Sequence, residues 1–166
     1  MLLIIFMLII ILTFIWYFIV RDVPIEHFPI KGNFITIKFN NKYLEGHKNG
    51  HIKIGNNELL GIYQVHDLPD FDGIRLESNK YPGYFLCCSK NKWKLKSKFF
   101  IKNNIKSIFI PVGNETQINN QHNISFINYS NGKCIEIHDK INVIAGIFNK
   151  KPTKSQIFEY ILVSHI

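Results

Sequence analysis

The sequence predicts an all-β domain built from three sets of four short strands. After residue 33 the apolar runs are short, and they alternate with turns rich in Asn, Gly and Lys, which is typical of antiparallel β structure. No segment in this part of the sequence shows convincing apolar spacing for an amphipathic helix. Similar residues recur at similar spacings in the three sets, which indicates an internal repeat.

The twelve predicted strands follow one another along the chain. The first set is predicted at residues 34–39, 42–46, 51–54 and 61–66. The second set is predicted at residues 73–78, 83–88, 92–96 and 107–112. The third set is predicted at residues 123–128, 133–138, 142–147 and 156–163. Turn-forming residues separate the strands, as in Asn40-Asn41, Lys48-Asn49-Gly50 and Ser130-Asn131-Gly132.

The spacing within the sets indicates how the strands assemble. Each second strand carries an aromatic or sulfur residue before an aliphatic one, in Tyr43-Leu44, Phe85-Leu86 and Cys134-Ile135. Each fourth strand carries an aromatic residue 19 or 23 residues later, at Tyr63, Phe109 and Phe158. One four-strand unit cannot bury its apolar face alone, whereas three units that close a barrel can. The pattern therefore resembles a β-trefoil, and a β-sandwich is the alternative that the strand number also allows.

The chain divides into a transmembrane anchor at 1–20, a linker at 21–33 and the β-trefoil-like domain at 34–166. The first twenty residues contain no charge, Gly or Pro, and as a helix they would span about 30 Å, the hydrocarbon thickness of a bilayer. Trp16 and Tyr17 lie near the end of this run, where aromatic rings favour the membrane interface. A cleaved signal peptide is the rival interpretation, but no basic residue precedes the apolar run and no small-residue cleavage site follows it.

The orientation of this single-pass protein is open, because two signals disagree. Arg21 and the lysines near it favour a cytoplasmic domain. Three N-glycosylation sequons, at Asn114, Asn123 and Asn128, favour a luminal or extracellular domain if they are used.

The strong positive charge is a weak functional signal in this chain. The formal net charge of +8 comes from 18 Lys and 2 Arg against 12 acidic residues. Ile, Asn and Lys together make up 66 of the 166 residues, a bias typical of AT-rich coding. Some of the lysines therefore need no functional explanation.

The most basic segment is SKNKWKLKSKFF at residues 89–100, where every second residue from Lys90 to Lys98 is a lysine. Alternate residues of a strand point to opposite faces, so Trp93 and Leu95 are expected in the core, opposite a lysine face made of Lys90, Lys92, Lys94, Lys96 and Lys98. That face is either an ordinary solvated one that discourages edge pairing, or an anion-binding site that also uses Lys102 and Lys106.

Sulfated glycans or anionic lipid headgroups would be the anionic partners of such a site in a membrane-anchored protein. Nucleic acid is disfavoured, because aromatic residues are not interleaved on the lysine face and Arg is scarce.

The three cysteines, Cys87, Cys88 and Cys134, are too few for a disulfide scaffold and lack the spacing of a zinc site. Either Cys134 forms a disulfide with Cys87 or Cys88 in an exported domain, or all three are buried and reduced. The sequence leaves both alternatives open.

The remaining polar residues predict binding or assembly rather than catalysis. His47 and His51 flank a turn without a third ligand, so neither a metal site nor a cofactor is expected. His66-Asp67 and His138-Asp139 end strands, where they suit turns or the rim of a sugar pocket. Glu77 and Glu136 are isolated carboxylates, and no nucleophile elbow, phosphate loop or metalloprotease motif is present.

The stretch LESNKYPGYFLCCS at residues 76–89 resembles the Ser-x-x-x-x-Pro-x-aromatic-aromatic-Leu-Cys segment of the interleukin-one family. Within it, IRLESNKYPGYFL (74–86) is also similar to the repeats of arabinofuranose-binding trefoil modules. Both resemblances imply the trefoil fold. The interleukin segment lies near the end of that family's domain, whereas a complete third set follows it here, so no receptor-binding residues are carried over. The QxW repeats of ricin-type lectins are absent.

The layout of the chain, with MLLIIFMLIIILTFIWYFIVR before a compact domain, resembles the 19 kDa per os infectivity factors of baculoviruses and nudiviruses. This resemblance implies a viral envelope protein that acts in host attachment or entry, with protein partners in the virion envelope or a host membrane. The alternatives are an anchored lectin-like module for acidic glycans and a cytokine-like trefoil that binds a receptor.

Overall fold

The computed structural model describes residues 34–89, 92–100, 105–118, 121–148 and 152–163, which form an all-β domain. The first set of strands is β1 (Phe34–Phe39), β2 (Lys42–Gly46), β3 (Ile52–Gly55) and β4 (Ile62–Leu68). The second set is β5 (Gly73–Ser78), β6 (Tyr84–Ser89), β7 (Lys92–Ser97) and β8 (Phe109–Ile118). The third set is β9 (Gln121–Asn128), β10 (Lys133–His138), β11 (Asn142–Ile147) and β12 (Phe158–Leu162).

Short 3-10 helices connect some of these strands: η1 (Glu58–Leu60), η2 (Pro69–Phe71), η3 (Lys98–Phe100), η4 (Ile105–Ser107) and η5 (Lys154–Gln156). No helix in the described part of the chain has the length and apolar character needed to cross a membrane. The predicted anchor at 1–20 and the linker at 21–33 lie outside the described residues.

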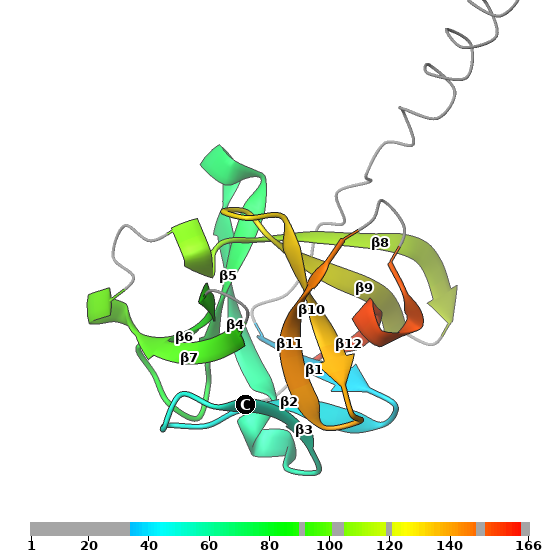
Figure 1. The fold of residues 1–166 in the computed structure, drawn as a ribbon, viewed down its shortest axis with the longest axis horizontal. Helices are drawn as coiled ribbons and strands as arrows, with labels where there is room; N and C mark the ends of the chain where they lie inside the picture. The colour runs from blue at the N-terminus through cyan, green and yellow to red at the C-terminus, as the bar shows by residue number, and fades with distance from the viewer. Residues whose placement is uncertain (1–33, 90–91, 101–104, 119–120, 149–151, 164–166) are drawn as a thin grey trace, which may run out of the picture.

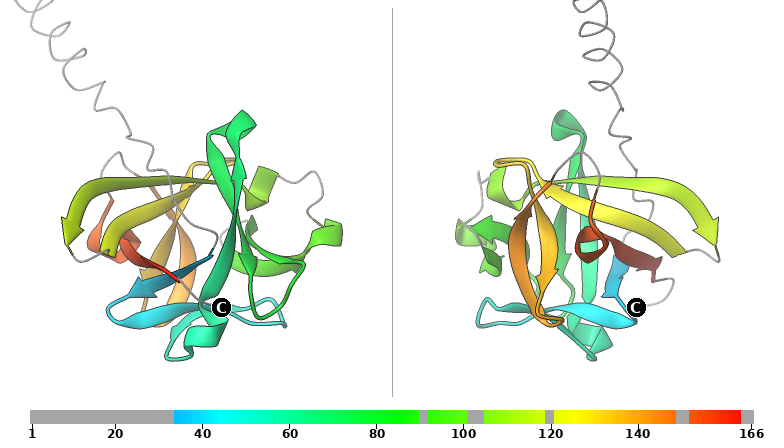
Figure 2. Two further views of the ribbon diagram at one scale, coloured as in Figure 1. Left: turned by 180° about the vertical axis from the view of Figure 1, so that it is seen from behind. Right: turned by 45° about the vertical axis from the view of Figure 1, so that its right-hand side comes forward.

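Six strands pair into a closed antiparallel ring, which Figures 1 and 2 show from three directions. The first and fourth strands of each set supply this ring, and the pairing runs β1–β4–β5–β8–β9–β12 and back to β1. The other six strands form three hairpins, β2–β3, β6–β7 and β10–β11. All twelve strands belong to one hydrogen-bonded sheet, and not to the two separate sheets of a sandwich.

The three hairpins meet one another at their third strands. Asn142 of β11 pairs with Lys53 of β3, and Ile144 of β11 pairs with Lys92 of β7. An isolated bridge joins His51 to Lys94, so that each of the three hairpins contacts the other two. The hairpins therefore form a connected layer, and none of them projects alone.

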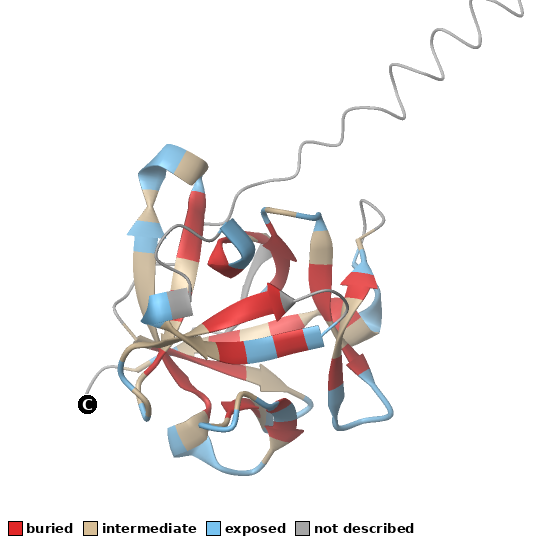
Figure 3. Ribbon diagram, turned by 60° about the vertical axis from the view of Figure 1, so that its left-hand side comes forward, coloured by how far each residue is buried: buried red, intermediate tan, exposed pale blue. Residues whose placement is uncertain are grey.

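One apolar core lies between the ring and the hairpins. The aromatic residues that recur in the fourth strands, Tyr63, Phe109 and Phe158, are all fully buried. Trp93 of β7 is 3% exposed and packs on Phe109 with ring centroids 5.0 Å apart. Its indole Nε1 has no hydrogen-bond acceptor among the described residues. Figure 3 shows how buried and exposed residues alternate along several strands, as a half-buried strand requires.

The all-β prediction is confirmed, and the strand phase predicted for residues 92–96 is correct, since Trp93 and Leu95 are buried while Lys92 and Lys94 are exposed. Two strands are longer than predicted by two or more residues, because β8 continues to Ile118 and β9 begins at Gln121. The extension pairs polar residues such as Asn114 and Asn123. It carries no apolar alternation, so the sequence pattern does not mark it.

Candidate functional site

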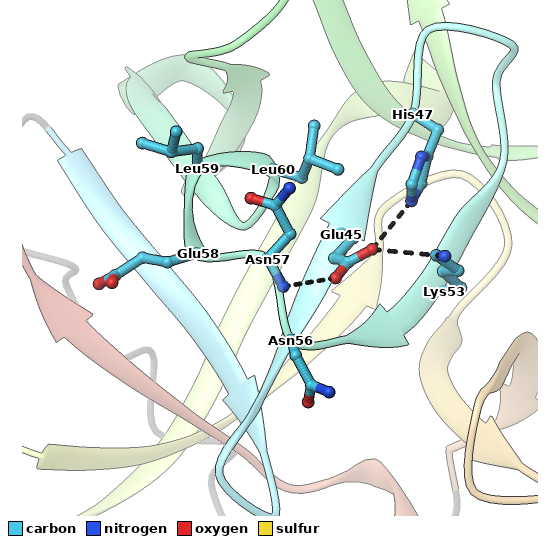
Figure 4. Close-up of a pocket in the computed structure, with 8 residues that line it drawn as sticks. All are labelled: Glu45, His47, Lys53, Asn56, Asn57, Glu58, Leu59 and Leu60. Atoms are coloured by element: carbon cyan, nitrogen blue, oxygen red, sulfur yellow. Dashed lines mark hydrogen bonds and ion pairs between the residues drawn. The ribbon is translucent and has the colours of Figure 1, made fainter.

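The centre of the candidate site is Glu45 on β2, which lies directly opposite Lys53 on β3 and is only 3% exposed. The backbone N–H of Asn57 donates to its Oε1 at 2.7 Å. His47 Nε2 lies 3.0 Å and Lys53 Nζ lies 3.7 Å from its Oε2, as Figure 4 shows. Burial of a carboxylate is costly unless hydrogen bonds and charges compensate for it. These three partners supply that compensation and fix the orientation of the carboxylate.

An open groove lies beside this carboxylate. Glu45, His47 and Lys53 line one side, and residues 56–60 line the other. Figure 4 shows the side chain of Glu58 pointing away from Glu45, and Leu59 is 61% exposed. The groove therefore combines a fixed hydrogen-bond acceptor, the nitrogen-bearing side chains of His47, Lys53, Asn56 and Asn57, and exposed aliphatic surface.

The base of the site is tightly packed. A Cβ atom at Gly55 would lie 2.0 Å from Glu45 Oε1, so the missing side chain makes room for the carboxylate. Below it, the hydroxyl of Tyr63 donates to the carbonyl of Leu44 at 2.9 Å. Burial, and secondarily the charge of Glu45, raises the pKa of Tyr63 far above its ordinary value. Tyr63 thus stays a protonated donor that holds the strand beneath the site.

Glu136 occupies the equivalent place in the third set. The hairpin registers align Glu45 with Glu136 and Gly55 with Gly146, because Tyr43 faces Gly55 as Cys134 faces Gly146. A Cβ atom at Gly146 would lie 1.7 Å from Glu136 Oε2. In the first and in the third hairpin, therefore, a glutamate carboxylate packs against a glycine of the neighbouring strand.

The space beside the third-set carboxylate is filled by Gln156, which is 2% exposed. Its Nε2 donates to Glu136 Oε2 at 3.0 Å and to the carbonyl of Ile147 at 3.1 Å. Its counterpart in the first set is Gly61. Each ends a turn closed by a backbone hydrogen bond, from Gly61 to Glu58 and from Gln156 to Thr153. Gly61 has no side chain to fill the groove, and a Cβ atom there would lie 2.7 Å from Tyr43 Cβ.

The second set has no carboxylate at this place. Register puts Cys87 where the other hairpins have glutamate and Lys96 where they have glycine. Cys87 is 1% exposed, and its burial raises the pKa of the thiol to about 12, with Lys96 as the larger of the opposing influences. Of the three equivalent places, the first alone combines a carboxylate with an open groove.

The predicted lysine face is divided by the structure. Lys92 and Lys94 are exposed on β7 and Lys96 is half-buried. Lys98 is exposed but begins η3, since β7 ends at Ser97 and the Lys98 N–H donates to the carbonyl of Gly83 at 2.7 Å. Lys106 is exposed on η4, a separate element. Lys90 and Lys102 lie outside the described residues.

Two of the sequon asparagines, Asn123 and Asn128, lie in very different environments. Asn123 is exposed on β9, opposite Asn114 on β8. Asn128 is fully buried, and its Nδ2 donates to the carbonyls of Lys106 and Ile108 at 2.8 and 3.2 Å. The amide that a glycan at Asn128 would need is therefore already used inside the protein, whereas that of Asn123 lies on an exposed residue.

The cysteines follow the second of the two alternatives left open by the sequence. Cys87, Cys88 and Cys134 are all free and buried. Cys134 Sγ donates to the carbonyl of Gly146 at 3.6 Å, a contact between β10 and β11 within the third hairpin.

The other polar candidates form pairs that the sequence does not reveal. His66 Nε2 lies 2.7 Å from Glu77 Oε2, and Glu77 Oε1 accepts the N–H of Gly83. A second hollow beside Glu77 is lined largely by Pro82 and by aromatic residues, including Phe99, which is 86% exposed. His138 Nδ1 lies 2.7 Å from Asp139 Oδ2 on the surface. No group of three His, Cys, Asp or Glu in the described segments is arranged to hold a metal ion.

Sequence reasoning missed Glu45 and Lys53 altogether. Their contact depends on the register of β2 against β3, which places a carboxylate opposite a lysine. The one usable signal is the repeated Glu-x-His in the second strands, at Glu45-Gly46-His47 and Glu136-Ile137-His138.

Comparison with known proteins gives a fold and no family. No protein-family model matches the chain, and no curated protein matches it. Among solved structures 137 chains match. One is a mosquitocidal holotoxin, with a TM-score of 0.68 at 11% sequence identity; the match covers 82% of this chain and 18% of the toxin chain. The chain thus corresponds to less than a fifth of the toxin's length, and a likeness at this identity shows the fold alone.

Proposed function

We propose that this chain is a membrane-anchored, non-enzymatic glycan-binding module with a β-trefoil fold, and that the groove beside Glu45 is its binding site. The closed ring of six strands with three hairpins supports the trefoil, because three four-strand repeats produce that arrangement. The likeness to part of a mosquitocidal holotoxin is consistent with it. The anchor rests on the uncharged sequence of residues 1–20.

The observation that carries the proposal is the fixed carboxylate of Glu45 in an open groove. A sugar hydroxyl both donates and accepts hydrogen bonds, so it can donate to a carboxylate and accept from an ammonium group such as that of Lys53. Leu59 adds exposed aliphatic surface on which the C–H face of a sugar ring can pack. A few fixed polar groups beside apolar surface are what small-molecule sites generally present.

The arrangement favours binding over hydrolysis of a glycan. Most glycosidases need two carboxyl groups that face the same bond. In this groove Glu45 is buried, and Figure 4 shows the other carboxylate, that of Glu58, pointing away from it. A single buried acceptor is suited to holding a ligand.

A glycan array probed with the full chain in phosphatidylcholine nanodiscs tests the proposal. We expect a restricted set of bound glycans and the loss of those hits in Glu45→Gln, which keeps the shape of the side chain but removes its charge. Glu136→Gln is the matched control and is expected to keep them, because Gln156 fills the groove beside Glu136. A blank array for the wild-type chain contradicts the proposal.

The attachment role of the module and the side of the membrane on which it acts stay predictions. A glycan-binding domain held at a membrane would serve the attachment role implied by the resemblance to viral envelope proteins. A protease-protection assay on the membrane-inserted chain decides which side of the bilayer the domain occupies. Protection of the domain inside sealed vesicles made in the cytoplasmic-side-out orientation would support an extracellular or luminal role, and digestion would contradict it.

A further inference from the structure

The third strands of the three hairpins present a common outward face. Residues directly opposite each other on antiparallel strands point to the same side. The pairs His51–Lys94, Lys53–Asn142 and Lys92–Ile144 therefore place six side chains on one face. The residues that alternate with them, Ile52, Trp93 and Val143, are buried, which identifies this face as the outer one. We call these six residues the junction face.

The junction face contains three lysines, one histidine and no acidic residue. His51, Lys53, Lys92 and Lys94 are all exposed. The carboxylates that register places beside them already have partners, and one of them, Glu45, pairs with Lys53 of this face. Glu45, opposite Lys53, is 3% exposed and holds the N–H of Asn57. Glu136, opposite Ile144, accepts a hydrogen bond from Gln156.

We infer that the junction face binds a sulfated polysaccharide, and that this polysaccharide also enters the Glu45 groove. Lys53 makes the connection, because it lines the groove and also belongs to the junction face. The inference rests on the proposed glycan-binding function and narrows its ligand to an anionic polymer. The sulfate groups meet the lysines of β3 and β7, while an unsulfated part of the polysaccharide occupies the groove.

The composition of the junction face favours a polysaccharide over the other anionic polymers. Its six residues include no Phe, Tyr or Trp on which a nucleic-acid base could stack and no Arg for bidentate base or phosphate contacts. Surfaces that bind membranes combine basic residues with inserted aromatic or aliphatic side chains. The one aliphatic residue of this face, Ile144, is half-buried.

Binding of labelled dextran sulfate to the full chain in phosphatidylcholine nanodiscs tests the inference, with uncharged dextran as the reference polymer. The variant Lys53→Gln, Lys92→Gln, Lys94→Gln is expected to bind dextran sulfate at least about tenfold more weakly and to show a shallower dependence on salt. The control variant Lys42→Gln, Lys80→Gln, Lys154→Gln removes the same charge from exposed residues away from the junction face. It is expected to stay within about twofold of the wild type, since general attraction to net charge is largely screened at physiological salt.

Several results would overturn the inference. Equal losses in the two triple variants would mean that only the net charge matters. Complete displacement of dextran sulfate by oligothymidylate at the same charge concentration would favour nucleic acid. Protection of Lys92 and Lys94 from acetylation by phosphatidylserine in the nanodisc, in the absence of polymer, would favour the membrane surface.

The variant Glu45→Gln separates this inference from the proposed function. It is expected to lose the array hits, which depend on the groove, while its affinity for dextran sulfate, which depends on the junction face, stays at least as high as that of the wild type. A blank array together with a site-specific loss in the Lys53, Lys92, Lys94 variant would refute the groove and leave the anion-binding face standing. Array hits without any binding of dextran sulfate would support the groove and refute the anion-binding face.

Discussion

The first and third hairpins carry the same carboxylate over the same kind of glycine, but only the first leaves it beside an open groove. Glu136 is closed off by Gln156, which donates to it and to the carbonyl of Ile147. Glu45 has Gly61 in the corresponding position and Lys53 across the strand, where the third hairpin has Ile144. The packing of a glutamate carboxylate against a glycine is therefore a structural feature that these two hairpins share. The neighbouring positions decide whether the carboxylate can also contact a ligand.

Removal of each carboxylate should separate a functional role from a structural one. We expect Glu45→Ala to weaken glycan binding by at least about tenfold, which corresponds to about 1.4 kcal/mol or more. Glu136→Ala should leave binding unchanged but lower the free energy of unfolding by about 1–3 kcal/mol, because it deprives the buried amide of Gln156 of an acceptor. Array titration and urea denaturation measure the two effects. Equal binding losses in both variants would show that the distinction between the hairpins is wrong.

Substitution of the glycine that packs against each carboxylate tests whether the two hairpins have the same packing. Gly55→Ala and Gly146→Ala both place a Cβ atom within 2.0 Å of a carboxylate oxygen. We expect both to reduce stability by about 1–3 kcal/mol, the range found for overpacked sites. The Gly55 variant alone should also weaken glycan binding, since it displaces Glu45. Unchanged thermal unfolding in either variant would mean that its carboxylate has room to move.

The variant Gln156→Ala tests whether the third hairpin becomes a binding site once the side chain that fills its groove is removed. The change should cost about 1–2 kcal/mol of stability, because the three hydrogen bonds of this side chain, with Glu136, Ile147 and Thr153, are lost. We expect no new binding from this change alone, since Ile144 offers no donor where Lys53 does in the first hairpin. Adding Ile144→Lys should raise the number of bound glycans per chain from one towards two in isothermal titration. A stoichiometry of one in the double variant would show that further residues define the site.

The second hairpin provides a prediction that is seen only at high pH, with a small effect at each pH step. Burial raises the pKa of Cys87 from 9.0 to about 12, so the folded state keeps a proton that the unfolded chain releases above pH 9. The contribution of this thiol to stability is therefore complete below pH 9 and is lost as the pH rises towards 12. Urea denaturation under reducing conditions should show a fall of at most about 1.4 kcal/mol per pH unit from this one thiol. The curve of Cys87→Ala should be correspondingly flatter, and parallel curves for the two proteins would contradict the assignment.

The strands were largely predictable from the sequence because their signals are local. Alternation of apolar residues and the turn residues between them act over a few positions, so strands such as β2, β5 and β10 begin and end where the pattern predicts. The phase of β7 was predictable for the same reason, since Trp93 and Leu95 alternate with lysines.

The candidate site was not predictable, because each part of it depends on contacts between distant segments. Lys53 meets Glu45 only through the hairpin register, and Gln156 reaches Glu136 from 20 residues away. The junction face needs β3 to lie beside β7, which brings His51 to Lys94 across 43 positions of the sequence. Asn128 illustrates the same limit, since a sequon looks alike whether its amide is exposed or bonded inside the fold.

Trp93 gives this protein a built-in optical reporter. It is one of two tryptophans in the chain, its indole is buried against Phe109, and no described residue accepts a hydrogen bond from its Nε1. A dry indole of this kind emits at short wavelength, and it lies between Lys92 and Lys94 on the inner side of the strand that carries them. An anionic ligand on the outer side would change the electric field at the indole without touching it. The emission spectrum of the unlabelled protein can therefore follow occupancy of the outer surface from within the core.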